Sequence, residues 1–167
     1  MKTADYIISL IGDNIRPHFL PVIIFLVAGL TSYATGTSWG TMAILMPIVI
    51  PLSHSVSGLY GLDAIESTLI LQGVISSVLA GCVFGDYCSP ISDTTILSSM
   101  ASGCDHVDHV RTQLPYAILI AIVCMFLGDI PSAYGLSPYL SLGLIGLVVV
   151  AVVLLIGKKT DLGLRKK

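Results

Sequence analysis

Charged residues are scarce in this 167-residue chain, at 11% of the sequence, while 54% of its residues are hydrophobic. A soluble domain typically carries about 25% charged residues, because it must cover its core with polar surface. The composition therefore excludes a soluble globular domain and predicts an integral membrane protein. A net charge of -2 gives no indication of a nucleic-acid partner, and none is expected.

Paired cysteines and catalytic pairs are also missing. The four cysteines are scattered without the paired spacing of a zinc ribbon, and a free cysteine in apolar sequence behaves as a small hydrophobic residue. The sequence shows no nucleophile–base pair and no complete set of metal ligands, so we expect neither an enzyme nor a bound cofactor. A metal site at 104–109 (CDHVDH) is one hypothesis, and a polar loop that caps the next helix is the one we favour.

Long uninterrupted apolar runs are rare in the first third of the chain. Residues 19–30 and 42–52 are each about a dozen residues long, whereas a helical membrane span needs roughly 20. Because a Gly/Thr/Ser stretch at 31–41 joins them, they predict a re-entrant helical hairpin over 19–53, or two short helices that meet at mid-membrane.

The rest of the chain predicts three longer helices, an interfacial helix at the N-terminus and a basic tail at the C-terminus. The apolar pattern over 64–101 is that of one helix interrupted by polar residues, so we expect a broken helix there. The fold class is therefore an all-α integral membrane protein. Its predicted parts are an interfacial helix at 1–17, a transmembrane domain at 18–157 that holds the hairpin (19–53), the broken helix (64–101) and spans at 115–130 and 140–156, and a basic tail at 158–167.

The basic tail predicts how the chain crosses the membrane. Five lysine and arginine residues lie within 158–167, and such residues concentrate on the cytoplasmic side. We therefore predict a multi-pass cell (plasma) membrane protein with a cytoplasmic C-terminus. Counting spans back from that end places the connection that contains Arg111 inside and the 54–63 connection outside.

Two polar stretches interrupt the apolar sequence, and the stronger one is 85–95 (GDYCSPISDTT), with two carboxylates and four serine or threonine hydroxyls. Hydrocarbon solvates none of these groups, so protein or a water-filled cavity must receive them. The stretch at 35–41 has the same form, although small residues there could serve only close helix packing. The candidate ion- or substrate-binding residues are Thr35, Thr37, Ser38, Asp86, Ser89, Ser92, Asp93 and Thr94.

These residue types suit a small hard cation. In broken membrane helices, unwound carbonyls and hydroxyl oxygens coordinate sodium, while exposed helix N-termini meet anions. A carboxylate in such a site can hold either sodium or a proton, which is the simplest chemistry for exchanging one for the other. Asp86 and Asp93 are the candidates, and we prefer Asp93 because Ser92 and Thr94 flank it.

Three ordered blocks, at 35–47, 85–99 and 103–116, together resemble the NhaC-type sodium/proton antiporter family. The resemblance implies the second half of an inverted-repeat ion-transporter fold, in which each half carries a re-entrant hairpin and a broken helix. It also implies a secondary antiporter that exchanges sodium for protons by alternating access. Members of this family are much longer, so we expect a fragment, or a chain that assembles in the lipid bilayer with a separate N-terminal half or as a homo-oligomer.

Two other functions remain open. A cation-coupled organic-anion exchanger of the malate/lactate type would use the helix N-termini expected at Ser38 and Ser92 to receive a carboxylate. A non-transporting membrane subunit would use the polar tips for assembly alone.

Overall fold

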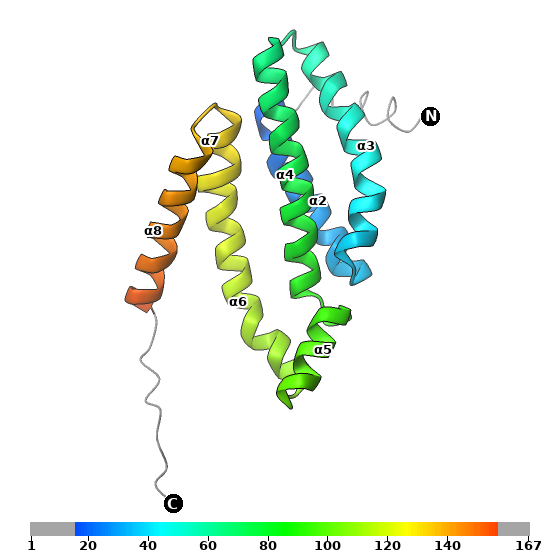
Figure 1. Cartoon of the computed structure of the whole chain (residues 1–167), viewed down its shortest axis with the longest axis vertical. Helices are drawn as coiled ribbons and strands as arrows, with labels where there is room; N and C mark the ends of the chain where they lie inside the picture. Colours follow the sequence, from blue (N-terminus) through cyan, green and yellow to red (C-terminus); the bar gives the residue numbers. More distant parts are fainter. Residues whose placement is uncertain (1–15, 157–167) are drawn as a thin grey trace, which may run out of the picture.

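The computed structural model describes residues 16–156, and over them the regular secondary structure is entirely helical (Figure 1). Five helical stretches are long and apolar enough to cross a membrane, which confirms an all-α membrane protein. The predicted tail at 158–167 and nearly all of the predicted helix at 1–17 lie outside the described residues. The elements are η1 (Pro17–Phe19), α2 (Leu20–Thr35), α3 (Ser38–Leu59), α4 (Ala64–Cys88), α5 (Asp93–Ser102), α6 (His106–Cys124), the π-helical turn η2 (Met125–Asp129), α7 (Ile130–Ala133) and α8 (Pro138–Ile156).

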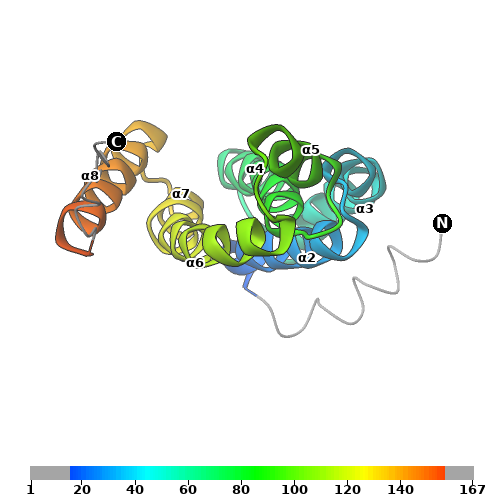
Figure 2. The ribbon, with the colours of Figure 1, turned by 90° about the horizontal axis from the view of Figure 1, so that it is seen from below.

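Helices α2, α3 and α4 form the packed part of the molecule, and α6 and α8 lie to one side of it (Figures 1 and 2). Within an apolar 18-residue stretch of α4, 39% of the residues are buried, compared with 11% of such a stretch in His106–Ala133 and 6% of Pro138–Leu155. The apolar surfaces of α6 and α8 are therefore left for lipid or for another polypeptide.

The two arms of the hairpin are longer than the sequence predicts. They form helical stretches of 19 residues (Pro17–Thr35) and 22 residues (Ser38–Leu59), so the second arm continues past residue 53. The polar residues at the tip are helical, and the hydroxyls of Thr31 and Thr35 are satisfied by donating to carbonyls one turn earlier, at 2.7 and 2.9 Å. Only Gly36, in the left-handed conformation (φ 66°), and the residue after it separate the arms.

Helix α6 also begins earlier than predicted, at His106 rather than near residue 115. The Asp105 carboxylate accepts hydrogen bonds from the backbone N–H groups of Val107 (2.9 Å) and Asp108 (3.1 Å), which caps the helix at its N-terminus. The polar residues that were expected to form a loop are therefore helical, and Pro115 lies inside the helix instead of in its first turn. Among residues 16–156, no group of three or more His, Cys, Asp and Glu side chains is arranged to hold a metal ion.

Two glycines one turn apart allow α4 to approach α2 closely. A Cβ atom at Gly81 would lie 2.5 Å from the Phe25 carbonyl oxygen and 2.9 Å from Cβ of Ala28, and one at Gly85 would overlap the Gly29 carbonyl oxygen. This is the small-xxx-small arrangement through which membrane helices pack backbone against backbone. The core around the contact is apolar and includes Leu20, Ile24, Ala28, Val74, Val78 and Cys82.

We predict that Gly85→Ala destabilises the α2–α4 pair, because the added methyl group would collide with backbone rather than with a movable side chain. Overpacking of this kind costs about 1–3 kcal/mol. The measurement is the midpoint temperature of unfolding in detergent. Gly143→Ala in α8 is the matched control, since a methyl group added there would meet nothing within 4 Å. Equal midpoints for the two variants would contradict the close approach.

Candidate functional site

A four-residue break separates α4 from α5, and its sequence explains why the helix stops. Ser89 has an extended backbone (φ -77°, ψ 129°), as expected for a residue that precedes proline. Pro90 cannot donate the hydrogen bond that would continue α4. Ser92 is again extended (φ -71°, ψ 134°), and α5 begins at the next residue.

Two buried serines hold the break, and the helix α4 that precedes it, against the end of α2. The Ser89 hydroxyl donates to the Tyr33 carbonyl at 2.8 Å, and the Ser32 hydroxyl donates to the Cys82 carbonyl at 2.6 Å. Ser32 and Ser89 are both fully buried. Because an unpaired hydroxyl is costly in an apolar interior, these contacts fix the register between α2 and α4.

Asp86, in the last turn of α4, is the centre of a small group of oxygen-bearing side chains. Its Oδ1 accepts a hydrogen bond from the Ser92 hydroxyl at 2.7 Å, and its Oδ2 accepts one from the Ser38 hydroxyl at 3.3 Å. The hydroxyls of Ser92 and Thr94 lie 2.8 Å apart. We call Ser38, Asp86, Ser92 and Thr94 the polar cluster. It joins the first turn of α3 to the break after α4, so the two polar stretches of the sequence meet in space.

The polar cluster can hold a positive charge by simple electrostatics. The hydrogen-bond partners of Asp86 are neutral hydroxyls, and its side chain is half-buried at the end of the packed helices. A sodium ion or a proton would neutralise the carboxylate, and the surrounding hydroxyl oxygens are hard ligands. The Ser92 hydroxyl is committed to Asp86 and makes no side-chain cap on α5.

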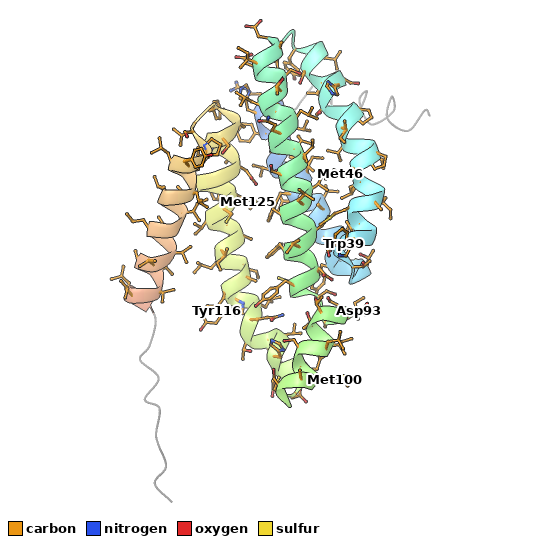
Figure 3. The ribbon with its side chains drawn as sticks, viewed as in Figure 1. Trp39, Met46, Asp93, Met100, Tyr116 and Met125 are labelled. Carbon is orange, nitrogen blue, oxygen red and sulfur yellow. The ribbon has the colours of Figure 1, made fainter. Side chains whose placement is uncertain are left out.

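The other four predicted residues do not reach the Asp86 carboxylate. The Thr35 hydroxyl lies 3.1 Å from that of Thr41, and Thr37 caps α3 by accepting from the Gly40 N–H at 3.4 Å. Ser89 is committed to α2. Within the described residues no hydrogen bond or ion pair reaches the exposed side chain of Asp93, which starts α5 near the end of the molecule that also holds the α2–α3 turn (Figure 3). The geometry therefore favours Asp86 over Asp93, the reverse of the sequence preference.

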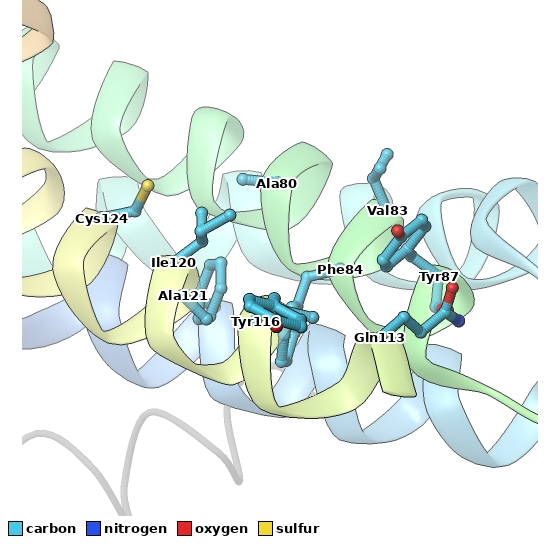
Figure 4. Close-up of a pocket in the computed structure, with 11 residues that line it drawn as sticks. Ala80, Val83, Phe84, Tyr87, Gln113, Tyr116, Ile120, Ala121 and Cys124 are labelled. Atoms are coloured by element: carbon cyan, nitrogen blue, oxygen red, sulfur yellow. The ribbon is translucent and has the colours of Figure 1, made fainter. Parts of the chain in front are cut away.

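Two hollows of the molecule lie away from the polar cluster. A cavity of about 560 Å³ opens between α4 and α6 (Figure 4), and a second of about 270 Å³ lies nearby against α2. Both are lined mainly by apolar and aromatic side chains such as Phe84, and neither includes a residue of the polar cluster. They suit an acyl chain or an apolar helix better than an ion.

Sequence reasoning missed the residues that hold the site in place. Ser32 carries a signal, because it lies within the predicted polar tip, and the spacing of Gly81 and Gly85 is a helix-packing motif. The sequence did not indicate that His106 contacts Pro90 in the break, or that His106 and His109 both contact Ser99 on α5. Nothing in the spacing of these residues indicates that they meet.

Comparison with known proteins gives one consistent result. The model of the Na+/H+ antiporter family matches residues 1–128. An uncharacterized protein of Haemophilus influenzae is 45% identical over 72% of this chain, and an uncharacterized Na(+)/H(+) antiporter of the same organism is 35% identical over 68%. A malate-2H(+)/Na(+)-lactate antiporter of Bacillus subtilis is 30% identical over 70%. No solved structure matches the chain.

The matched segments cover only 21–23% of the length of these relatives. The family match nevertheless includes the hairpin, the break and the polar cluster, so the similarity includes the candidate site and not only apolar helices. The chain is a multi-pass membrane protein of a transporter family and not an enzyme. Together with the NhaC-type motifs, the family match shows that this chain belongs to the Na+/H+ antiporter family.

Proposed function

We propose that this chain forms part of a secondary antiporter that exchanges sodium for protons across the cell membrane by alternating access. Asp86 is the carboxylate that holds the two ions in turn. Ser38, Ser92 and Thr94 supply further oxygen ligands, and Thr35, Thr37, Ser89 and Asp93 complete the surroundings. The observation that carries the proposal is the contact of Asp86 with hydroxyls from two separate breaks.

The size of the polar cluster supports exchange rather than permanent binding. A carboxylate and a few hydroxyls attract one sodium ion weakly enough to release it, whereas a complete protein cage would retain it. Sodium and a proton compete for the same oxygens, because either one neutralises the carboxylate. Competition at one group couples their opposite movements when only the neutralised carboxylate passes between the two access states.

The arrangement also supports an inverted-repeat transporter of which this chain is the second half. The polar α2–α3 hairpin tip and the break after α4 would be its re-entrant hairpin and broken helix, with the first half on the remaining sequence of a longer protein, on a separate chain or on a second copy. The α5–α6 corner and the C-terminal end of α8 lie at the same end of the molecule (Figure 1), as they must if both face the cytoplasm.

The central test is Asp86→Asn in everted vesicles from a host that lacks sodium/proton antiporters. The amide keeps the shape of the side chain but carries no charge, so we expect sodium-dependent proton flux to fall at least 100-fold. Glu66→Gln is the matched control, because Glu66 is exposed in the first turn of α4 and should leave flux unchanged. If both Asp86→Asn and Asp93→Asn transport like wild type, the carboxylate assignment is wrong.

A second test removes one hydroxyl. Ser92→Ala takes away a 2.7 Å hydrogen bond to the Asp86 carboxylate, and a bond to a charged group is worth about 1.5–3 kcal/mol. We therefore expect the sodium concentration for half-maximal flux to change by about ten-fold or more. Ser98→Ala, at an exposed position of α5, is the control. An unchanged half-saturation for Ser92→Ala would remove Ser92 from the site.

An organic-anion exchanger is the second candidate, because one relative is a malate-2H(+)/Na(+)-lactate antiporter. The first N–H groups of α5 have no side-chain cap, which suits a carboxylate. The negative charge of Asp93 at the same helix start opposes an anion, and for this reason we place sodium/proton exchange first.

Labelled malate and lactate distinguish the two candidates. For a sodium/proton antiporter we expect no uptake of either compound into vesicles above the level of empty vesicles, with or without a sodium gradient. Sodium-dependent uptake that Asp86→Asn abolishes would instead establish the organic-anion function.

A further inference from the structure

Two histidines at the start of α6 lie at the corner between α5 and α6, and one of them, His106, contacts the break. His106 contacts two elements, with Nδ1 3.2 Å from the Ser99 hydroxyl on α5 and Nε2 on the Pro90 carbonyl in the break. His109 Nδ1 lies 2.8 Å from the same hydroxyl. One turn further along α6, the side-chain amide of Gln113 donates to the Tyr87 carbonyl at 2.6 Å.

Counting protons assigns the donors in this group. A carbonyl only accepts, so His106 must carry its proton on Nε2 to bind Pro90. Ser99 has a single hydroxyl proton, which it donates to the Thr95 carbonyl at 2.8 Å. The Ser99 oxygen is then an acceptor for His109, which must carry its proton on Nδ1. The two neutral histidines therefore have opposite tautomers.

The same contacts survive if His106 becomes an imidazolium. Its Nδ1–H then donates to the Ser99 oxygen, while the Ser99 hydroxyl keeps its hydrogen bond to the Thr95 carbonyl. The hydrogen bond from Nε2 to the Pro90 carbonyl therefore does not depend on the charge of His106. The group is thus a fixed clamp on the break rather than a switch.

We propose that His106 is a positioning residue for the polar cluster, acting through the Pro90 carbonyl. Pro90 is two residues from Ser92, whose hydroxyl binds Asp86 at 2.7 Å. By holding Pro90 against α6 and Ser99 at once, His106 sets where the break places Ser92. The effect of this clamp on ion affinity rests on the proposed function, while its effect on the break does not.

A pair of substitutions separates the two contacts of His106. The Gln amide reaches about as far as Nε2 and keeps a donor for Pro90, whereas the shorter Asn amide reaches only as far as Nδ1 and loses it. We expect hydrogen–deuterium exchange in the peptide that covers 89–92 to be about five-fold faster in His106→Asn than in wild type, the equivalent of one lost hydrogen bond. His106→Gln restores the wild-type rate.

His109→Asn is the matched control, because the Asn amide keeps the contact with Ser99 and His109 makes no contact with the break. All variants are compared as the full chain in nanodiscs, with monodisperse elution as the test of folding. Equal exchange rates for the Asn and Gln variants of His106, whether fast or slow, would overturn the proposal.

Nitrogen-15 spectra of histidine-labelled protein at alkaline pH provide a spectroscopic signature. We expect His106 as the Nε2–H tautomer and His109 as the Nδ1–H tautomer, identified by the loss of each signal in the corresponding variant. The same tautomer for both residues would contradict the donor assignment.

Sodium-dependent flux distinguishes this proposal from the function itself. If the clamp and the antiport are both correct, His106→Asn raises or lowers the half-saturating sodium concentration about five-fold, with His106→Gln near wild type. Faster exchange in His106→Asn alone, without any sodium-dependent flux in wild type, would keep the clamp and reject the antiporter. Sodium-dependent flux in wild type, together with equal hydrogen–deuterium exchange rates in His106→Asn and His106→Gln, would keep the antiporter and reject the clamp.

Discussion

The close approach of α2 and α4 is the constraint on which the rest of this structure depends. At Gly81 and Gly85 the two backbones meet where no side chain fits. Without water or a hydrophobic driving force in the bilayer, such contacts and the hydrogen bonds beside them hold helices together. Because Asp86 directly follows Gly85, the same contact that packs the helices brings the carboxylate to the hairpin tip.

Several polar residues in and beside the two polar stretches bond to backbone rather than to a ligand. Thr31 and Thr35 donate to their own helix, and Ser32 and Ser89 donate across to the neighbouring helix. A membrane protein must pair these groups internally, since lipid offers no partners. The polar cluster around Asp86 consists of few side chains, and this suits a single ion better than a large substrate.

Part of this arrangement could be predicted from sequence, and the reasons differ from residue to residue. The break was predictable because Pro90 and the residues around it cannot continue an apolar helix. A capping role was expected of residues 104–109, but the early start of α6 was missed, since which of them caps the helix depends on a geometry that composition does not show. Asp93 was preferred to Asp86 because flanking hydroxyls in sequence suggested a shell, whereas in space the hydroxyls of Ser38 and Ser92 meet Asp86.

The sequence by itself determined that this protein is embedded in a membrane, that it is helical and to which family its motifs belong. Hydrophobicity and motif spacing are properties of the chain alone. Only the tertiary structure decided which carboxylate meets the second polar break and which residues clamp the break in place. Those contacts join residues 48 positions apart in the case of Ser38 and Asp86, and 16 in the case of Pro90 and His106. Their distances depend on how closely two backbones can pack, which no local pattern specifies.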